Sequence, residues 1–98
     1  MDMNENHLAS AIISVLNERK RQDEKWGQQN HEPTVWLGIL GEEFGELCQA
    51  VNETWFDNGP EEQKKGGYAN MRAEAVQVAA VAVSLIECLD RRHGGNES

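Results

Sequence analysis

Apolar residues in this 98-residue chain recur at steps of three and four, which is the period of an amphipathic helix. The first such segment runs from about His7 to Lys25, and its repeating face carries Leu8, Ile12 and Val15. Its second half, ERKRQDEKW, is almost wholly charged. A charged half of this kind either lines a polar site or is a solvated face, and the sequence leaves both interpretations open.

A second helix is predicted from about Thr34 to Trp55, after the connecting segment GQQNHEP. Steps of three and four join the residues of its predicted packing seam, which are Leu37, Leu40, Phe44, Leu47 and Val51. Gly38, Gly41 and Gly45 lie on one flank of the same helix, although each glycine costs about 1 kcal/mol relative to alanine. Such a flank indicates that another helix or a ligand approaches the backbone closely.

The segment from Phe56 to Gly67 is predicted to be a loop with one short helical turn at PEEQKK, because Asn-Gly-Pro and Gly-Gly interrupt it. The third helix is predicted from about Tyr68 to His93, and it is apolar on two sides. A three-helix protomer covers only one of these sides comfortably. We therefore predict an all-α fold with a single domain over residues 1–98. Its antiparallel bundle of three long helices and one short one is completed by forming a homodimer or a tetramer, with the third helix in the interface.

Composition narrows the range of functions. The formal charge of −8, from 17 acidic and 9 basic residues, argues against binding a nucleic-acid polymer, which needs a basic surface. A single nucleotide carried by metal ions remains compatible. Cys48 and Cys88 have no partner at metal-ligand or redox spacing, so we predict reduced, mostly buried thiols. The chain contains no apolar run of membrane-spanning length and begins with MDMNENHLAS, so we predict a cytoplasmic protein with no membrane partner.

Glutamates of the second and third helices form the strongest chemical pattern in the sequence. Glu42, Glu43 and Glu46 occupy an arc of about 100° on the second helix and border its apolar stripe, where uncompensated negative charge is costly. Glu74 borders the apolar stripe of the third helix, and it can face these acids if the two helices pack antiparallel. Hard oxygen ligands without cysteine or histidine favour magnesium or manganese over zinc. The alternative is an ordinary solvated acidic helix face.

The run GEEFGELCQAVNE, followed by YANMRAEAVQVAAVAVSLIECL and preceded by ERKRQDEKWG and a histidine, resembles the MazG-type all-α nucleoside triphosphate pyrophosphohydrolases. The resemblance covers about residues 18–89. The family pattern is E-E-x-x-E, a spacer, and E-x-x-D, all linked to magnesium. This chain keeps four of the five acids across a spacer of 27 residues, but Gln77 stands where the family has aspartate. A neutral amide can offer a carbonyl oxygen and brings no charge.

The resemblance implies a role for each of these residues. The residues that would hold the metal are Glu42, Glu43, Glu46, Glu74 and Gln77. Glu42 or Glu43 would also act as the catalytic base, and the sequence does not say which.

The resemblance also implies contacts with the substrate. Lys25 would contact a phosphate and Trp26 would stack on a base, with His31 close by in sequence. A tryptophan at a helix end is, however, more often a core anchor. Arg72 could reach a phosphate or neutralise Glu74, and it equally fits a surface ion pair.

Three functions are compatible with this sequence. The first, implied by the resemblance, is magnesium-dependent hydrolysis of a nucleoside triphosphate substrate to the monophosphate and pyrophosphate, with a house-cleaning role on deoxynucleotides. The second is a nucleotide-binding or regulatory dimer with little or no turnover, which Gln77 favours. The third is a purely structural helical oligomer with a solvated acidic face.

Overall fold

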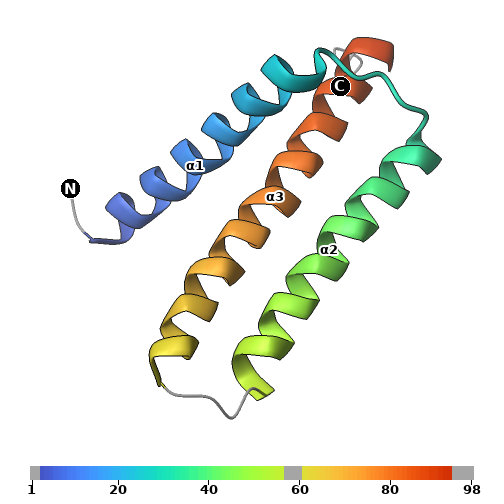
Figure 1. Ribbon diagram of the computed structural model, residues 1–98. Helices are drawn as coiled ribbons and strands as arrows, with labels where there is room; N and C mark the ends of the chain where they lie inside the picture. The colour runs from blue at the N-terminus through green and yellow to red at the C-terminus, as the bar shows by residue number, and fades with distance from the viewer. Residues whose placement is uncertain (1–2, 57–60, 94–98) are drawn as a thin grey trace.

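The computed structural model describes residues 3–56 and 61–93, and this part of the chain is all-helical with no strand. Helix α1 spans Met3–Trp26, α2 spans Pro33–Phe56 and α3 spans Glu61–His93. Figure 1 shows α3 between the other two helices, antiparallel to α2 and inclined to α1, whose N-terminal half diverges from α3. In the described residues α1 and α2 do not pack on each other, so α3 joins the two. The predicted all-α class is confirmed.

Helix α3 begins earlier than the sequence suggested. The described part of the short turn predicted at PEEQKK, from Glu61 on, is the first part of α3 and not a separate helix, and the helix continues through Gly66 and Gly67. A Cβ atom added at Gly67 would overlap the Thr54 side chain of α2, lying 2.8 Å from its Cγ2. The glycine therefore permits a close approach of two helices, and it was wrong to interpret it as part of a loop that interrupts the helix.

The connection between α1 and α2 is fastened to the C-terminal end of α3. Gly27 has a φ of 71°, a left-handed conformation that suits glycine, and its N–H donates to the carbonyl of Asp23 in the last turn of α1. Arg91 donates to the Gln29 carbonyl at 3.0 Å and to the Asn30 side chain. The neighbouring Arg92 donates to the Glu32 carboxylate at 3.0 Å. These bonds hold the connecting loop between α1 and α2 against the C-terminal end of α3.

The core is small and is centred on Trp36, Val81 and Cys88, with partly buried leucines and isoleucine packed around them. The seam predicted for α2 is only partly correct, because Leu37, Phe44 and Val51 are exposed in this chain. The buried residues of α2 are Trp36, Ala50 and Thr54, and the first two directly precede the exposed Leu37 and Val51.

Several other surface features differ from the sequence-based expectations. Nothing lies within 4 Å of a Cβ built at Gly38, Gly41 or Gly45, so the close approach predicted on this flank is not made within the described chain. Cys88 is buried, but Cys48 is exposed, which corrects the prediction of two buried thiols. In the described residues both cysteines are free, and none of the helices has the length and apolarity needed to span a bilayer.

Candidate metal centre and adjoining cavity

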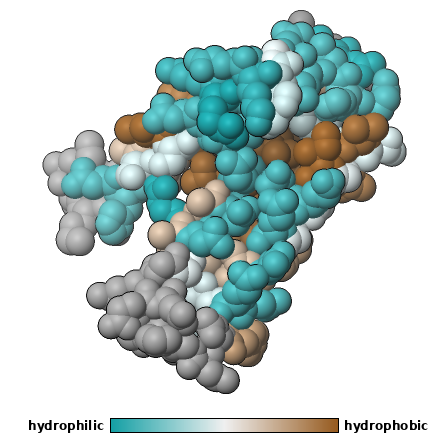
Figure 2. Space-filling model, in the orientation of Figure 1, coloured by the Kyte–Doolittle hydropathy of each residue, from teal (hydrophilic) through white to brown (hydrophobic). Residues whose placement is uncertain are grey.

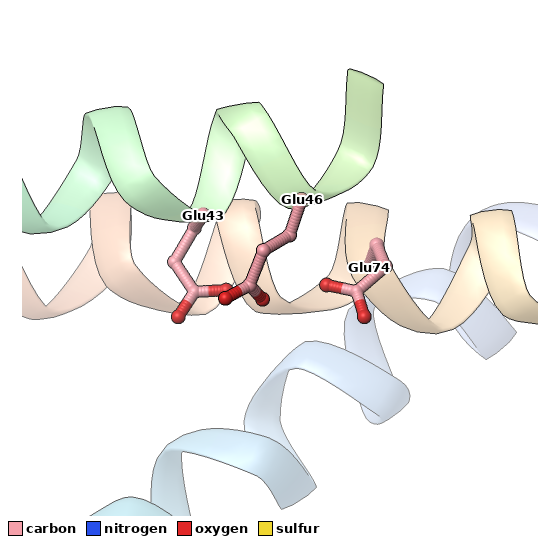
Figure 3. A group of neighbouring side chains, drawn as sticks. All are labelled: Glu43, Glu46 and Glu74. Carbon is pink, nitrogen blue, oxygen red and sulfur yellow. The ribbon is translucent and has the colours of Figure 1, made fainter. Parts of the chain in front are cut away.

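Three glutamates from two helices converge on one point. Glu43 and Glu46 are three residues apart on α2 and therefore share a face, while Glu74 reaches them from α3. One carboxylate oxygen from each lies within 4.8 Å of the others. Figure 3 shows the three side chains pointing into the space that α1 passes. This is the arrangement expected if α2 and α3 pack antiparallel.

The cluster is electrostatically costly without a counterion. Glu43 Oε2 and Glu74 Oε2 are buried and have no hydrogen-bond partner in the described part of the chain. Burial is the main cause that raises the pKa of Glu43, and the charges of Glu46, Glu74, Glu42 and Glu18 raise it further. Burial also raises the pKa of Glu74, and the charge of Glu46 raises it further. A proton or a cation would relieve this repulsion.

The donor set fits a hard divalent cation. It consists only of carboxylate oxygens, which magnesium and manganese prefer, and no cysteine or histidine belongs to this cluster of described residues. The two orphaned oxygens are acceptors without a donor, so a cation at this point would satisfy both. Glu43, Glu46 and Glu74 are the residues that would hold it.

Two of the predicted ligands are not among these three glutamates. Glu42 is exposed and acts on Glu43 only through its charge. Gln77 is partly buried, and it forms the wall of a neighbouring cavity together with Glu43.

This cavity has a volume of about 210 Å³ and lies between α1, the connecting loop, α2 and α3. Amides, indoles and one hydroxyl account for most of its polar lining. The lining residues are Gln22, Trp26, Gln29, Trp36, Ile39, Glu43, Gln77, Val81 and Ser84. The indole Nε1 of Trp36 is buried without a hydrogen-bond partner among the described residues, so this part of the molecule retains an unused donor.

The predicted substrate-binding residues are distributed unevenly around the cavity. Trp26 lines it and is about half exposed, and the Lys25 ammonium lies 4.7 Å from the centre of the Trp26 ring. His31 packs edge-on against Trp36, with ring centres 4.9 Å apart, and so supports the cavity wall from behind. Arg72 lies elsewhere: it donates to Ser14 Oγ at 3.0 Å beside a groove between α1 and α3.

Sequence reasoning missed the contribution of Glu18. Its side chain is only 11% exposed, and it accepts hydrogen bonds from Arg21 at 2.6 Å and Gln22 at 3.3 Å. Hydrogen bonding to Arg21 lowers the pKa of Glu18 most, against the opposing effect of burial, and the Gln77 and Gln22 amides lower it further. Glu18, Gln22 and Trp26 are spaced by four residues and so share one face of α1. That spacing within the charged half of α1 was the available signal.

Comparison of the chain with family models, curated proteins and solved structures gives no match. The class that the fold and the site define is therefore a three-helix protein with an oxygen-rich candidate metal centre beside an amide- and indole-lined cavity.

Proposed function

We propose that the protein is a magnesium-dependent nucleoside triphosphate pyrophosphohydrolase that converts nucleotides, deoxynucleotides among them, to the monophosphate and pyrophosphate. One observation carries the proposal: buried, unpartnered carboxylate oxygens of two helices lie beside a cavity lined by amides and indoles. The sequence resemblance to MazG-type enzymes agrees with it. A triphosphate needs cationic compensation, whereas a nucleobase needs a flat apolar surface and hydrogen-bonding groups.

The residues divide this work between them. Bound by Glu43, Glu46 and Glu74, a magnesium ion would offset the charge of the triphosphate and polarise a water molecule. Glu42 lies outside the cluster and keeps its carboxylate exposed, so we assign it the role of accepting the proton of the water that attacks the α-phosphorus.

The base would occupy the neighbouring cavity. Trp26 offers a half-exposed indole face for stacking, and Lys25 beside it would meet a phosphate. The cavity amides and the free N–H of Trp36 would hydrogen-bond to the edge of the base.

A product assay tests the proposal. Purified protein is incubated with magnesium and each member of a deoxynucleotide panel that includes dUTP and modified bases, and released pyrophosphate is measured. We expect turnover that chelation abolishes and that Glu43→Gln lowers at least about 100-fold. Glu53→Gln is the matched control, because Glu53 is an exposed α2 glutamate whose carboxylate accepts a hydrogen bond from Gln49 of the same helix and belongs to no acidic cluster of the described residues. No pyrophosphate release from any nucleotide would refute the proposal.

Binding without turnover is the second candidate function, and Gln77 is the observation that favours it. An amide replaces the fifth acid of the resembled pattern, and it lies on the wall of the cavity that Glu43 also lines. Tight nucleotide binding by calorimetry together with no product in the assay would select this candidate. Product formation would exclude it.

We also propose that the chain acts as a homodimer or a dimer of dimers. Its radius of gyration is 16.0 Å, against about 13 Å for a compact domain of this length. Figure 2 shows hydrophobic side chains open to solvent between hydrophilic ones. Leu37, Phe44 and Trp55 are 57–69% exposed on the outer face of α2, and an apolar groove of about 460 Å³ separates α1 from α3. Surfaces of this kind are typical of association sites. The cytoplasmic location stays a prediction.

A further inference from the structure

Gln22 is a buried amide that α1 contributes to the cavity wall, and hydrogen bonds hold it at both ends. The residue is only 8% exposed, although α1 is exposed along much of its length. Arg19 Nη1 donates to Gln22 Oε1 at 3.1 Å, and Gln22 Nε2 donates to Glu18 Oε2 at 3.3 Å. An arginine can only donate and a carboxylate can only accept, so the two bonds fix which end of the amide carries its oxygen.

Both partners of Gln22 are themselves held in place. The Arg19 side chain is only 11% exposed, and its Nε donates to the Glu87 carboxylate of α3 at 2.7 Å. Arg21 donates to both oxygens of Glu18, at 2.9 and 2.6 Å, and these bonds lower the pKa of Glu18 more than burial raises it. The Gln22 amide is therefore ordered before a ligand arrives, which reduces the entropy that binding must cost.

The amide keeps hydrogen-bonding capacity that the described residues do not use. A side-chain amide has two N–H hydrogens and two oxygen lone pairs, and the bonds to Arg19 and Glu18 take one of each from Gln22. Gln22 lines the cavity, and so does Trp26, which lies four residues later on the same face of α1. An amide matches the adjacent donor and acceptor groups on the edge of a nucleobase, and an indole offers a face on which the base stacks.

We propose that Gln22 determines base recognition by hydrogen-bonding to the edge of the nucleobase, and that Arg19 is a positioning residue, which holds the Gln22 amide in a single orientation. The inference rests on the proposed function, since it concerns the part of the same site that would take the base. The acidic cluster comes from the other two helices. Loss of the Gln22 amide should therefore weaken nucleotide binding and leave metal binding unchanged.

A double-mutant cycle tests both roles. Binding of the nonhydrolysable α,β-imido analogues of the deoxynucleoside triphosphates, with magnesium, is measured by calorimetry for the wild type, Gln22→Met, Arg19→Met and the double variant. We expect Gln22→Met to weaken binding of the preferred analogue about tenfold and to narrow the differences between bases, because one edge group loses its partner. Arg19→Met should weaken binding about threefold to tenfold, since the freed amide must then be ordered on binding.

The interaction between the two substitutions is the decisive quantity. If Arg19 acts through Gln22, Arg19→Met should have almost no further effect on analogue affinity in the Gln22→Met background. An equal loss in both backgrounds would mean that Arg19 acts only by attaching α1 to α3, and would overturn its positioning role. Unchanged affinity and base preference in Gln22→Met would overturn base recognition by this residue.

Two controls exclude a general effect on the helices. Asp23→Asn removes the charge of an exposed partner of Arg19, at 2.9 Å, and leaves the bond from Arg19 to Gln22. Analogue affinity should not change in this variant. Mn²⁺ binding without nucleotide, measured by electron paramagnetic resonance, should be the same in every variant, because the acidic cluster contains no residue of α1.

The outcomes separate this inference from the proposed function. A wild type that releases pyrophosphate, combined with a Gln22→Met variant of unchanged affinity and base preference, refutes the inference and supports the enzyme. A wild type that binds the analogues through Gln22 but releases no pyrophosphate from any nucleotide supports the inference and refutes the enzyme. A wild type that binds none of the analogues refutes both.

Discussion

Replacing Glu74 by glutamine separates the repulsion within the acidic cluster from its affinity for metal. Its carboxylate lies within 4.8 Å of those of Glu43 and Glu46, so the substitution removes two of the three pairwise repulsions. At this separation each repulsion amounts to about 1 kcal/mol at the dielectric constant of water and about 3 to 4 kcal/mol at an effective value of 20. Glu46 is exposed, which favours the lower end of that range.

We therefore expect Glu74→Gln to stabilise the metal-free protein by about 1 to 2 kcal/mol, which raises its Tm by roughly 5 to 15 °C. Magnesium should raise the Tm of the wild type much more than that of the variant. It binds only the folded wild type and so raises its Tm by mass action, and this increase should be largely lost in the variant. Scanning calorimetry at pH 7, with chelator and with excess magnesium, gives all four values.

Two controls make this result interpretable. Glu53→Gln, an exposed substitution on α2, the helix that carries Glu43 and Glu46, should change the free energy of unfolding by no more than about 0.5 kcal/mol, with or without magnesium. A purely structural oligomer predicts that magnesium leaves the wild-type Tm unchanged. A lower metal-free Tm for Glu74→Gln, or an equal rise with magnesium in the wild type and the variant, would refute a repulsive, metal-binding cluster at these glutamates.

Three further predictions concern the acidic cluster, the contact between α2 and α3, and the exposed apolar face of α2. Glu43 and Glu74 have raised pKa values, so their stabilising effect is complete below about pH 4.3 and is lost as pH rises through the folded-state pKa values. The metal-free Tm of the wild type should therefore fall toward pH 7 relative to that of a Glu43→Gln, Glu74→Gln double variant. Parallel Tm profiles of the two proteins would contradict this. Gly67→Ala should destabilise by about 1 to 3 kcal/mol in urea unfolding despite alanine's higher helix propensity, because its methyl group meets Thr54; a gain would show that the helices separate readily. Light scattering should give the wild type a molar mass that is a multiple of 11.0 kDa and should give Leu37→Glu a smaller one. The control Asn17→Glu should have the same mass as the wild type, and a monomeric wild type would exclude the oligomer.

The helices and the pairing of acids were accessible from sequence because both depend on local spacing. Glu43 and Glu46 share a face through a three-residue step, and antiparallel packing of α2 and α3 suffices to bring Glu74 to them. The burial of α2 was not accessible in the same way. Apolar residues cover most of its circumference, so periodicity could not decide which part α3 covers, and the structure buries Trp36 and exposes Leu37.

Residues whose contacts depend on how the helices are placed relative to one another were the ones that sequence reasoning could not place. Glu18 belongs to a run in which nearly every residue is charged, and only the position of α1 against α3 distinguishes it from its exposed neighbours. Arg72 is separated from Glu74 by a single residue, yet its guanidinium lies against Ser14 of α1. Gly67 resembles a breaker in sequence, and the contact that explains it comes from Thr54 on another helix.

The site consequently has two parts of different origin. The acidic cluster is formed by α2 and α3, which pack on each other, and α1 contributes no residue to it. The cavity does require α1, because Gln22 and Trp26 form one of its walls. Helix α1 is attached to α3 through Arg19, which donates to Glu87 at 2.7 Å and to Gln22 at 3.1 Å. The arginine that ties α1 to α3 thus also orients the glutamine that holds Glu18. Metal affinity should therefore depend mainly on the α2–α3 pair, and nucleotide affinity on the position of α1.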